Sequence, residues 1–170
     1  MFVLGIDPGL TRCGYGLVAK RTGAATFTAT AAGTIETDPR DAVERRLFEL
    51  SGGLRALLVE YRPDVVVVER LFFQTNARTA TGVAQACGVA LACAVEHGCA
   101  VAQYTSNEVK LAVVGYGAAT KLQVQTMVAR QVGLSGPPPS PDAADALALA
   151  VCHLVGSSLR AAVGAAEARR

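Results

Sequence analysis

The alternation of apolar and polar positions predicts that the chain begins with three strands. Residues 2–7 are a short apolar run, typical of a buried strand, and residues 15–20 and the threonine-rich residues 25–36 have the composition of two more. The turn "PGLTRCG" separates the first two of them. Together these segments predict an antiparallel meander.

The pattern then changes to helical spacing. Within residues 40–61, apolar residues such as Leu50 and Leu54 recur among charged ones, which predicts an amphipathic helix. The β-branched run "DVVVVE" at residues 64–69 is typical of a central strand covered on both faces. The remaining elements are predicted as a long Ala/Gly-rich helix over residues 76–97, a strand over 99–105, and helices over 106–114, 121–133 and 141–155.

This order of elements predicts an α/β fold in which helices flank a mixed sheet on both faces. A chain of 170 residues is large enough to form one domain with a sizeable core. We expect that domain to span residues 1–156. Residues 157–170 include "RAAVGAAEARR", which has no clear apolar face, and we expect them to be a flexible tail.

Composition narrows the function classes. The net charge is only +2, so a nucleic-acid surface would depend on the local placement of basic residues. The five cysteines are odd in number and form no CxxC pair, which is typical of small buried residues in a reducing cytoplasm. The start "MFVLGIDPG" lacks a basic region, so we expect no secretory signal there. Residues 79–95 are uncharged, but they are short for a membrane span and contain Gln85, so we expect no membrane segment.

Two aspartates interrupt the apolar run "SPDAADALALAV". Ser140 is a good N-cap and Pro141 suits the first helical position, so Asp142 lies in the first turn, where a carboxylate is favourable. Capping does not explain Asp145. The spacing of three residues puts both carboxylates on one side of the helix, where crowded negative charges favour a bound cation.

Two inner strands also end in an acid, Asp7 and Glu69. If these strands are adjacent and parallel, both carboxylates lie at one edge of the sheet, and the last helix can bring Asp142 and Asp145 to it. Four carboxylates in one pocket would suit two Mg²⁺ or Mn²⁺ ions and the hydrolysis of a phosphodiester. The simpler alternative is that Asp7 opens a turn and Glu69 begins a loop.

Four blocks of the sequence resemble the RuvC-type crossover junction endodeoxyribonucleases, which resolve Holliday junctions and have the ribonuclease-H-like fold. The blocks are "GIDPGLTRCGYGLV", "VVVVERLFFQTN", "VVGYGAATKLQVQ" and "PDAADALALAVCH", in this order and with an acid at each expected place. The resemblance implies a ribonuclease-H-like mixed five-stranded sheet. It also implies that Asp7, Glu69, Asp142 and Asp145 are the metal-binding catalytic acids.

The family chemistry implied by this resemblance is hydrolysis by metal-activated water, with two Mg²⁺ ions per active site and Mn²⁺ able to substitute. The substrate would be a four-way DNA junction in recombination and repair, cut by symmetric nicks that leave 5′-phosphate and 3′-hydroxyl ends. A homodimer suits such a near-symmetric junction. The branch-migration helicase complex would be a further partner.

Other residues are candidates for holding the DNA. Phe72 and Phe73 are adjacent aromatics between Arg70 and Arg78, and one ring can stack on an unpaired base; the resemblance favours Phe72. "GYGAATK" lacks the glycine that a Walker loop needs directly before Lys121, which argues against nucleotide binding. We instead expect Lys110 and Lys121 to contact phosphates, roles that the resemblance also marks.

Three rival functions remain open from the sequence. They are a ribonuclease-H-like nuclease that acts on RNA, a junction-binding protein without activity, and an ATP-binding module of the actin-like superfamily. The last would need two such domains, and this chain supplies one. The presence of all four acids disfavours the second.

Overall fold

The computed structural model describes residues 1–20, 26–70 and 77–167, with backbone alone over 77–79 and 158–167. The strands are Phe2–Asp7 (β1), Arg12–Lys20 (β2), Phe27–Glu36 (β3), Val65–Glu69 (β4) and Ala100–Tyr104 (β5). The helices are Val43–Tyr61 (α1), Ala77–Glu96 (α2), Ser106–Val114 (α3), Lys121–Gln131 (α4) and Pro141–Glu167 (α5).

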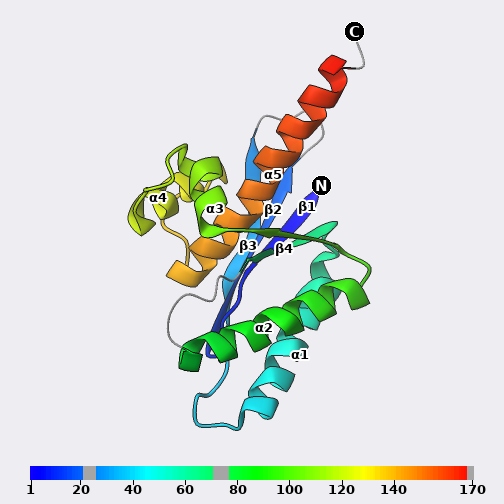
Figure 1. Cartoon of the computed structure of the whole chain (residues 1–170), viewed down its shortest axis with the longest axis vertical. Coiled ribbons are helices and arrows are strands. Elements are labelled where there is room, and N and C mark those ends of the chain that lie inside the picture. Colours follow the sequence, from blue (N-terminus) through cyan, green and yellow to red (C-terminus); the bar gives the residue numbers. More distant parts are fainter. Residues whose placement is uncertain (21–25, 71–76, 168–170) are drawn as a thin grey trace.

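The five strands form one mixed sheet in the order β3-β2-β1-β4-β5 (Figure 1). β2 pairs antiparallel with both β1 and β3, whereas β4 pairs parallel with both β1 and β5. The predicted antiparallel meander and the predicted central strand over residues 64–69 are confirmed. The sheet therefore has a parallel half, at whose carboxyl edge the ends of β1 and β4 lie together.

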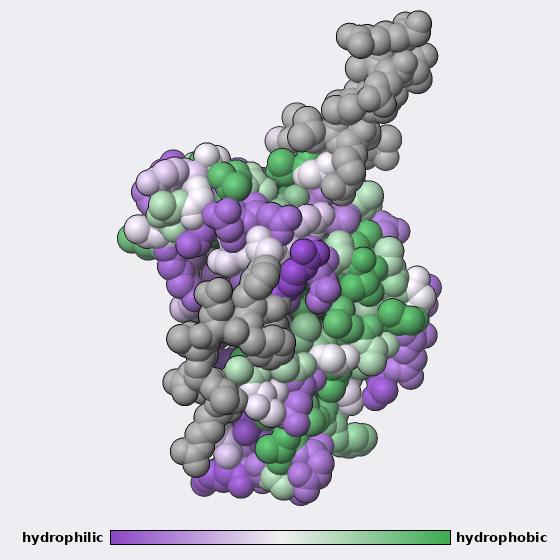
Figure 2. Space-filling model, in the orientation of Figure 1, coloured by the Kyte–Doolittle hydropathy of each residue, from purple (hydrophilic) through white to green (hydrophobic). Residues whose placement is uncertain are grey.

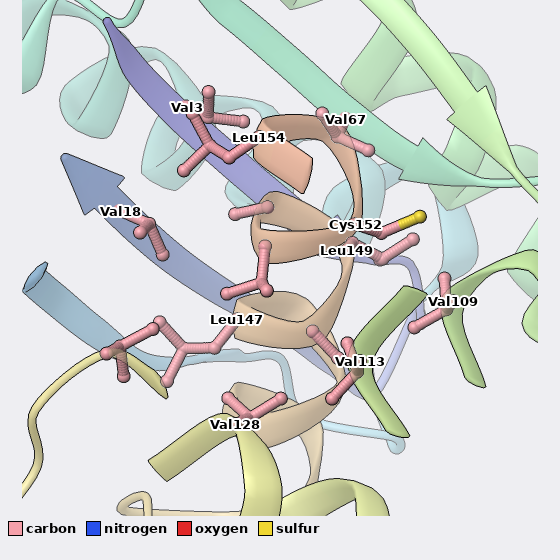
Figure 3. Close-up of a cluster of buried hydrophobic side chains, with 14 of the residues drawn as sticks. Val3, Val18, Val67, Val109, Val113, Val128, Leu147, Leu149, Cys152 and Leu154 are labelled. Carbon is pink, nitrogen blue, oxygen red and sulfur yellow. The ribbon is translucent and has the colours of Figure 1, made fainter. Parts of the chain in front are cut away.

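Helices cover both faces of the sheet, as predicted (Figure 1). Side chains that alternate along a strand enter two separate cores: Val3 and Val67 face α3, α4 and α5, while Leu4 and Val66 face α1 and α2. Figure 3 shows the first of these cores, with Leu147, Leu149 and Leu154 of α5 at its centre. The apolar run in β4 is thus explained by burial on both sides.

Small residues let α2 lie close to the rest of its own chain. Ala86, Ala90 and Ala94 are buried in the core that α2 shares with α1 and the sheet. Gly88 and Ala92 are exposed on the opposite side. The small residues of α2 therefore serve packing within the chain along one face and are exposed along the other.

The start of α5 matches the predicted capping. The Ser140 hydroxyl accepts a hydrogen bond from the backbone N–H of Ala143 at 3.0 Å and lies 2.9 Å from the hydroxyl of Thr34. Ser140 therefore caps α5 and ties its first turn to β3. This contact helps to fix where the following aspartates lie.

The end of α5 differs from the prediction. The helix continues to Glu167 instead of ending near residue 155, and its C-terminal part extends past the sheet (Figure 1). The alanine-rich sequence explains this, because alanine has the highest intrinsic helix propensity and needs no buried face to favour a helix. The division into a domain of residues 1–156 and a tail of 157–170 stays a prediction.

Glycines in β1 and β2 allow α5 to lie directly on the sheet. A Cβ atom at Gly5 would overlap the backbone carbonyl of Ala146, and one at Gly14 would overlap that of Asp142. A Cβ at Gly16 would come within 2.7 Å of Leu147. The backbone of α5 therefore occupies the space that side chains would otherwise fill.

We expect Gly5→Ala to destabilise the protein by about 2 kcal/mol or more, because the added methyl group cannot be accommodated without moving α5. Gly52→Ala is the matched control: Gly52 is a helical glycine of α1, and nothing beyond its own stretch of helix lies within 4 Å of the place that a Cβ would take. This control should be neutral or stabilising by up to about 1 kcal/mol. Urea unfolding of both variants measures the difference, and equal stability would contradict the close contact between α5 and the sheet.

Candidate active site

The acids predicted from the sequence meet at the carboxyl edge of the parallel strands. Ile6 of β1 pairs with Val68 of β4, so Asp7 and Glu69 follow side by side. Helix α5 adds Asp145, and the three carboxylates line one pocket of about 250 Å³. The remaining lining residues come from α3, α4 and α5: Ser106, Val109, Lys110, Lys121, Val124, Ala148 and Leu149.

Asp145 is paired with a lysine in this pocket. Its Oδ2 lies 2.7 Å from Nζ of Lys121, the first residue of α4, and this hydrogen bond is the main cause that raises the pKa of Lys121. Lys121 was predicted to contact a DNA phosphate. In the structure its ammonium group is the counter-charge of Asp145, and its contact with DNA stays a prediction.

Asp142 does not line the pocket, although the sequence predicted four acids there. Its Oδ2 accepts a hydrogen bond from Nε of Arg12 at 2.8 Å, and Arg12 also contacts Glu36 at 3.1 Å. Two causes explain this difference. Residues three apart on a helix point about 60° apart, and Arg12, a residue that sequence reasoning missed, attracts the carboxylate to its own side.

The sequence carries no signal for the pair between Arg12 and Asp142, because 130 positions separate the two residues. Only the packing of α5 across β2 brings them together. Ser106 in the pocket was missed for the same reason.

Burial and mutual repulsion act on the two acids at the strand ends. Burial, followed by the charges of Asp145, Glu69 and Asp142, raises the pKa of Asp7 to about 7. Burial and then the charge of Asp145 also raise the pKa of Glu69. Lys121 opposes both shifts. The pocket therefore holds more negative charge than its single lysine partner neutralises.

The donor chemistry of these acids fits a hard divalent cation such as Mg²⁺ or Mn²⁺, which prefers carboxylate oxygens. As arranged in the structure, the His, Cys, Asp and Glu residues within the described ranges form no group of three or more that could hold a metal ion. In this arrangement Lys121 and Arg12 bind the carboxylates of Asp145 and Asp142. The metal-ligand roles of the four acids stay a prediction.

The predicted DNA-binding residues fall into two groups. Lys110 of α3 lines the pocket. Arg70 directly follows Glu69, the last residue of β4, and its side chain is exposed. Its Nη2 donates a hydrogen bond to the carbonyl of Gln103 at 3.5 Å. Phe72 and Phe73 lie outside the described residues, as does the side chain of Arg78.

The residue that argued against a Walker loop has a structural role. Thr120 is the N-cap of α4 and forms a capping box with Gln123. Thr105 and Glu108 cap α3 in the same way. The two capped helices hold Lys110 and Lys121 over the pocket.

No helix found within the described residues combines the length and apolar character that crossing a membrane requires. The expectation that residues 79–95 are not a membrane segment agrees with this. Those residues belong to α2, which packs on α1 and the sheet.

Asp7 should make the metal-free protein less stable as the pH rises. Its pKa of about 7 in the folded state exceeds the ordinary value of 3.8, so the stability it contributes is complete below about pH 4 and is lost as the pH rises through 7. In the presence of a chelator, Asp7→Asn should therefore melt at a higher temperature than the parent at pH 8, and at a similar temperature at pH 4. Asp41→Asn, at a surface pair with Arg45, is the control. An equal difference at both pH values would contradict the shift.

Comparisons with known proteins agree with the fold and the site. The family model of the crossover junction endodeoxyribonuclease RuvC matches residues 3–153. The crossover junction endodeoxyribonuclease RuvC of Salinispora arenicola is 51% identical over 172 residues, which cover 100% of this chain and 98% of that protein.

Solved structures lead to the same family. The Thermus thermophilus RuvC in complex with a Holliday junction substrate is 34% identical, with a TM-score of 0.88 over 94% of this chain and 96% of that one. The yeast mitochondrial Holliday junction resolvase shares the fold at 14% identity, with a TM-score of 0.66 over 90% of this chain and 77% of that one. The expected ribonuclease-H-like fold is confirmed, and the chain belongs to the crossover junction endodeoxyribonuclease RuvC family.

Proposed function

We propose that this chain is a structure-selective endonuclease that resolves four-way DNA junctions by paired symmetric nicks, in recombination and repair. The observation that carries the proposal is the meeting of Asp7, Glu69 and Asp145 in one pocket, with Asp142 beside them, in a member of this family. The junction is the substrate in the complex of the related Thermus thermophilus RuvC.

We propose that Asp7, Glu69, Asp142 and Asp145 hold two divalent cations, Mg²⁺ by preference. When bound, such cations activate water and neutralise charge on the phosphate that is cut. The residues of this chain would provide the surroundings for that chemistry. Burial first, and then the charge of neighbouring acids, raises the pKa of Asp7 and that of Glu69, and a bound cation would relieve the repulsion between these acids.

Lys121 would have two positions in this scheme. Its ammonium group now neutralises Asp145, and a cation on that carboxylate would release it towards a DNA phosphate. Lys110 already lines the pocket and makes no ion pair with an acid among the described residues. Both lysines, with Arg70, Arg78, Phe72 and Phe73, are proposed to hold the DNA.

Two opposed nicks need two active sites, so we propose a homodimer. Hydrophobic residues reach the surface over α1 and α2, in the lower part of Figure 2. Phe48, Val59 and Val95 are 76%, 60% and 67% exposed there. These side chains and the exposed small residues of α2 support a partner surface. The branch-migration helicase complex is proposed as a further partner.

A cytoplasmic location is proposed as well. All five cysteines are free thiols, and burial raises the pKa of Cys13 and that of Cys152 to about 12. Buried and protonated thiols are compatible with a reducing compartment.

The proposal is tested by incubating the protein with a labelled four-way junction, a linear duplex and an RNA–DNA hybrid, each with Mg²⁺, Mn²⁺ or a chelator. We expect metal-dependent cutting of the junction alone, at opposed positions. Preferred cutting of the hybrid would replace the proposal with a nuclease that acts on RNA. Tight junction binding without cutting in either metal would indicate a binding protein.

Asp145→Asn should reduce junction cleavage by about 100-fold or more, because it removes a charge that holds the cation while it keeps the size of the side chain. Junction binding should persist, since it depends on basic and aromatic residues. Asp41→Asn, at the surface pair with Arg45, should cut like the parent. Cleavage rates and junction affinities measured on the same preparations decide the matter. Near-normal cleavage by Asp145→Asn would exclude its role as a metal ligand.

Lys110→Ala should weaken junction binding and lower the slope of log affinity against log salt concentration by about 0.9, as expected for one lost phosphate contact. Arg130→Ala, which removes an exposed charge in the last turn of α4, is the control for net charge. Salt titrations from low to moderate ionic strength measure the slope. Identical slopes for Lys110→Ala and the parent would exclude a phosphate contact by this lysine.

A further inference from the structure

A second pocket, of about 510 Å³, lies beside the acidic residues and shares Arg12 with them. Its wall is formed by the loop after Asp7, by the first turn of α1 and by the second and third turns of α2. The lining residues are Gly9, Leu10, Thr11, Arg12, Val43, Arg46, Thr81, Gly82, Val83 and Gln85. Among the described residues, this lining contains two guanidinium groups and no acid.

Arg46 is a buried cation that forms no ion pair with any of the described residues. It is only 8% exposed, and it donates from Nε to the Thr37 hydroxyl at 3.0 Å and from Nη2 to the Thr11 hydroxyl at 2.7 Å. In the described part of the chain no carboxylate lies within ion-pair distance of Arg46. Asp38 is near enough for its pKa to be lowered slightly by Arg46, but its carboxylate is bound by Arg40.

A buried charge that meets only neutral groups is costly, because its hydration is lost and no opposite charge replaces it. Part of the role of Arg46 is structural. Thr37, which accepts one of its hydrogen bonds, donates to the carbonyl of Leu10 at 2.6 Å, so Arg46 fixes the loop that follows Asp7. Neutral hydroxyl contacts would serve that purpose without a charge, so the charge itself remains to be explained.

The chemistry of the pocket fits an oxyanion. A guanidinium has five donors in a planar fork that matches a phosphate, and the two bonds to hydroxyls use only part of this capacity. Thr11 and Gln85 are exposed at the pocket and add a hydroxyl and an amide. Arg12, now bound to Asp142, would be released towards the pocket if a cation took that carboxylate.

The position of the pocket identifies the source of the oxyanion. Its first lining residue, Gly9, lies two positions after Asp7, so the pocket adjoins the proposed cleavage site. A DNA strand that presents one phosphate to the acids carries further phosphates on either side of it. We propose that this pocket binds a phosphodiester of the DNA backbone that is not cut, and so fixes the register of the strand at the acids. This inference rests on the proposed function.

Val43 provides a test that leaves the buried arginine intact. It lies one helical turn before Arg46, lines the pocket and is 42% exposed. Val43→Glu places a negative charge at the pocket in the first turn of α1, where a carboxylate favours the helix. Thr126→Glu is the matched control, because Thr126 is also a β-branched residue, is exposed on helix α4 and does not line the pocket.

We expect Val43→Glu to bind a four-way junction about tenfold more weakly than Thr126→Glu at low salt. The slope of log affinity against log salt should also fall by about 0.9 for Val43→Glu alone. Both variants should melt close to the parent. Affinities that agree within twofold, with equal slopes, would overturn the phosphate site.

Arg46 itself is tested with a pair of variants. Arg46→Met removes the charge and Arg46→Lys keeps it, although both lose the bonds to Thr37 and Thr11 and should lower the melting temperature. At a temperature where both are folded, Arg46→Lys should retain more junction affinity and the steeper salt dependence. Equal affinity of the two variants would show that the charge does not act on DNA.

The two proposals fail differently. If the parent protein cuts no junction with either metal, the proposed function is wrong. If the parent cuts the junction and Val43→Glu binds it like Thr126→Glu, the function stands and the second phosphate site is excluded.

Discussion

The close contact between α5 and the glycines of β1 and β2 is the constraint on which the site depends. Gly5 and Gly14 leave no room between the sheet and the backbone of α5 at Ala146 and Asp142. This contact fixes the height and direction of the helix over the sheet. Because Asp145 is carried by the same helix, the packing of the core and the position of a candidate metal ligand are set together.

Charge balance is the second constraint. The carboxyl ends of parallel strands bring Asp7 and Glu69 together, and α5 adds further negative charge. The folded chain therefore needs basic side chains there. Lys121 and Arg12 supply them, each bound to one aspartate of α5. These ion pairs neutralise the aspartates of α5 in the folded protein when no metal is bound. They also hold two basic groups next to the place where a phosphate would bind.

Much of the fold could be predicted because its signals are local. The β-branched run at residues 64–69 predicted a strand covered on both faces, and the structure confirms it between β1 and β5. The helix starts at Ser106, Lys121 and Pro141 were predicted at the residues where the structure has them. The end of α5 was predicted too early, since the absence of an apolar face was given more weight than the helix propensity of alanine.

The sequence by itself determined the strand ends that bring Asp7 and Glu69 together and the capping of α5, because each depends on neighbouring residues or on a strand pattern. Only the tertiary structure decided which basic side chain each aspartate of α5 binds. Arg12 lies 130 positions from Asp142, and the pocket around Arg46 combines a loop with two helices. Contacts of this kind follow from how the layers pack in space, and no periodicity along the chain records them.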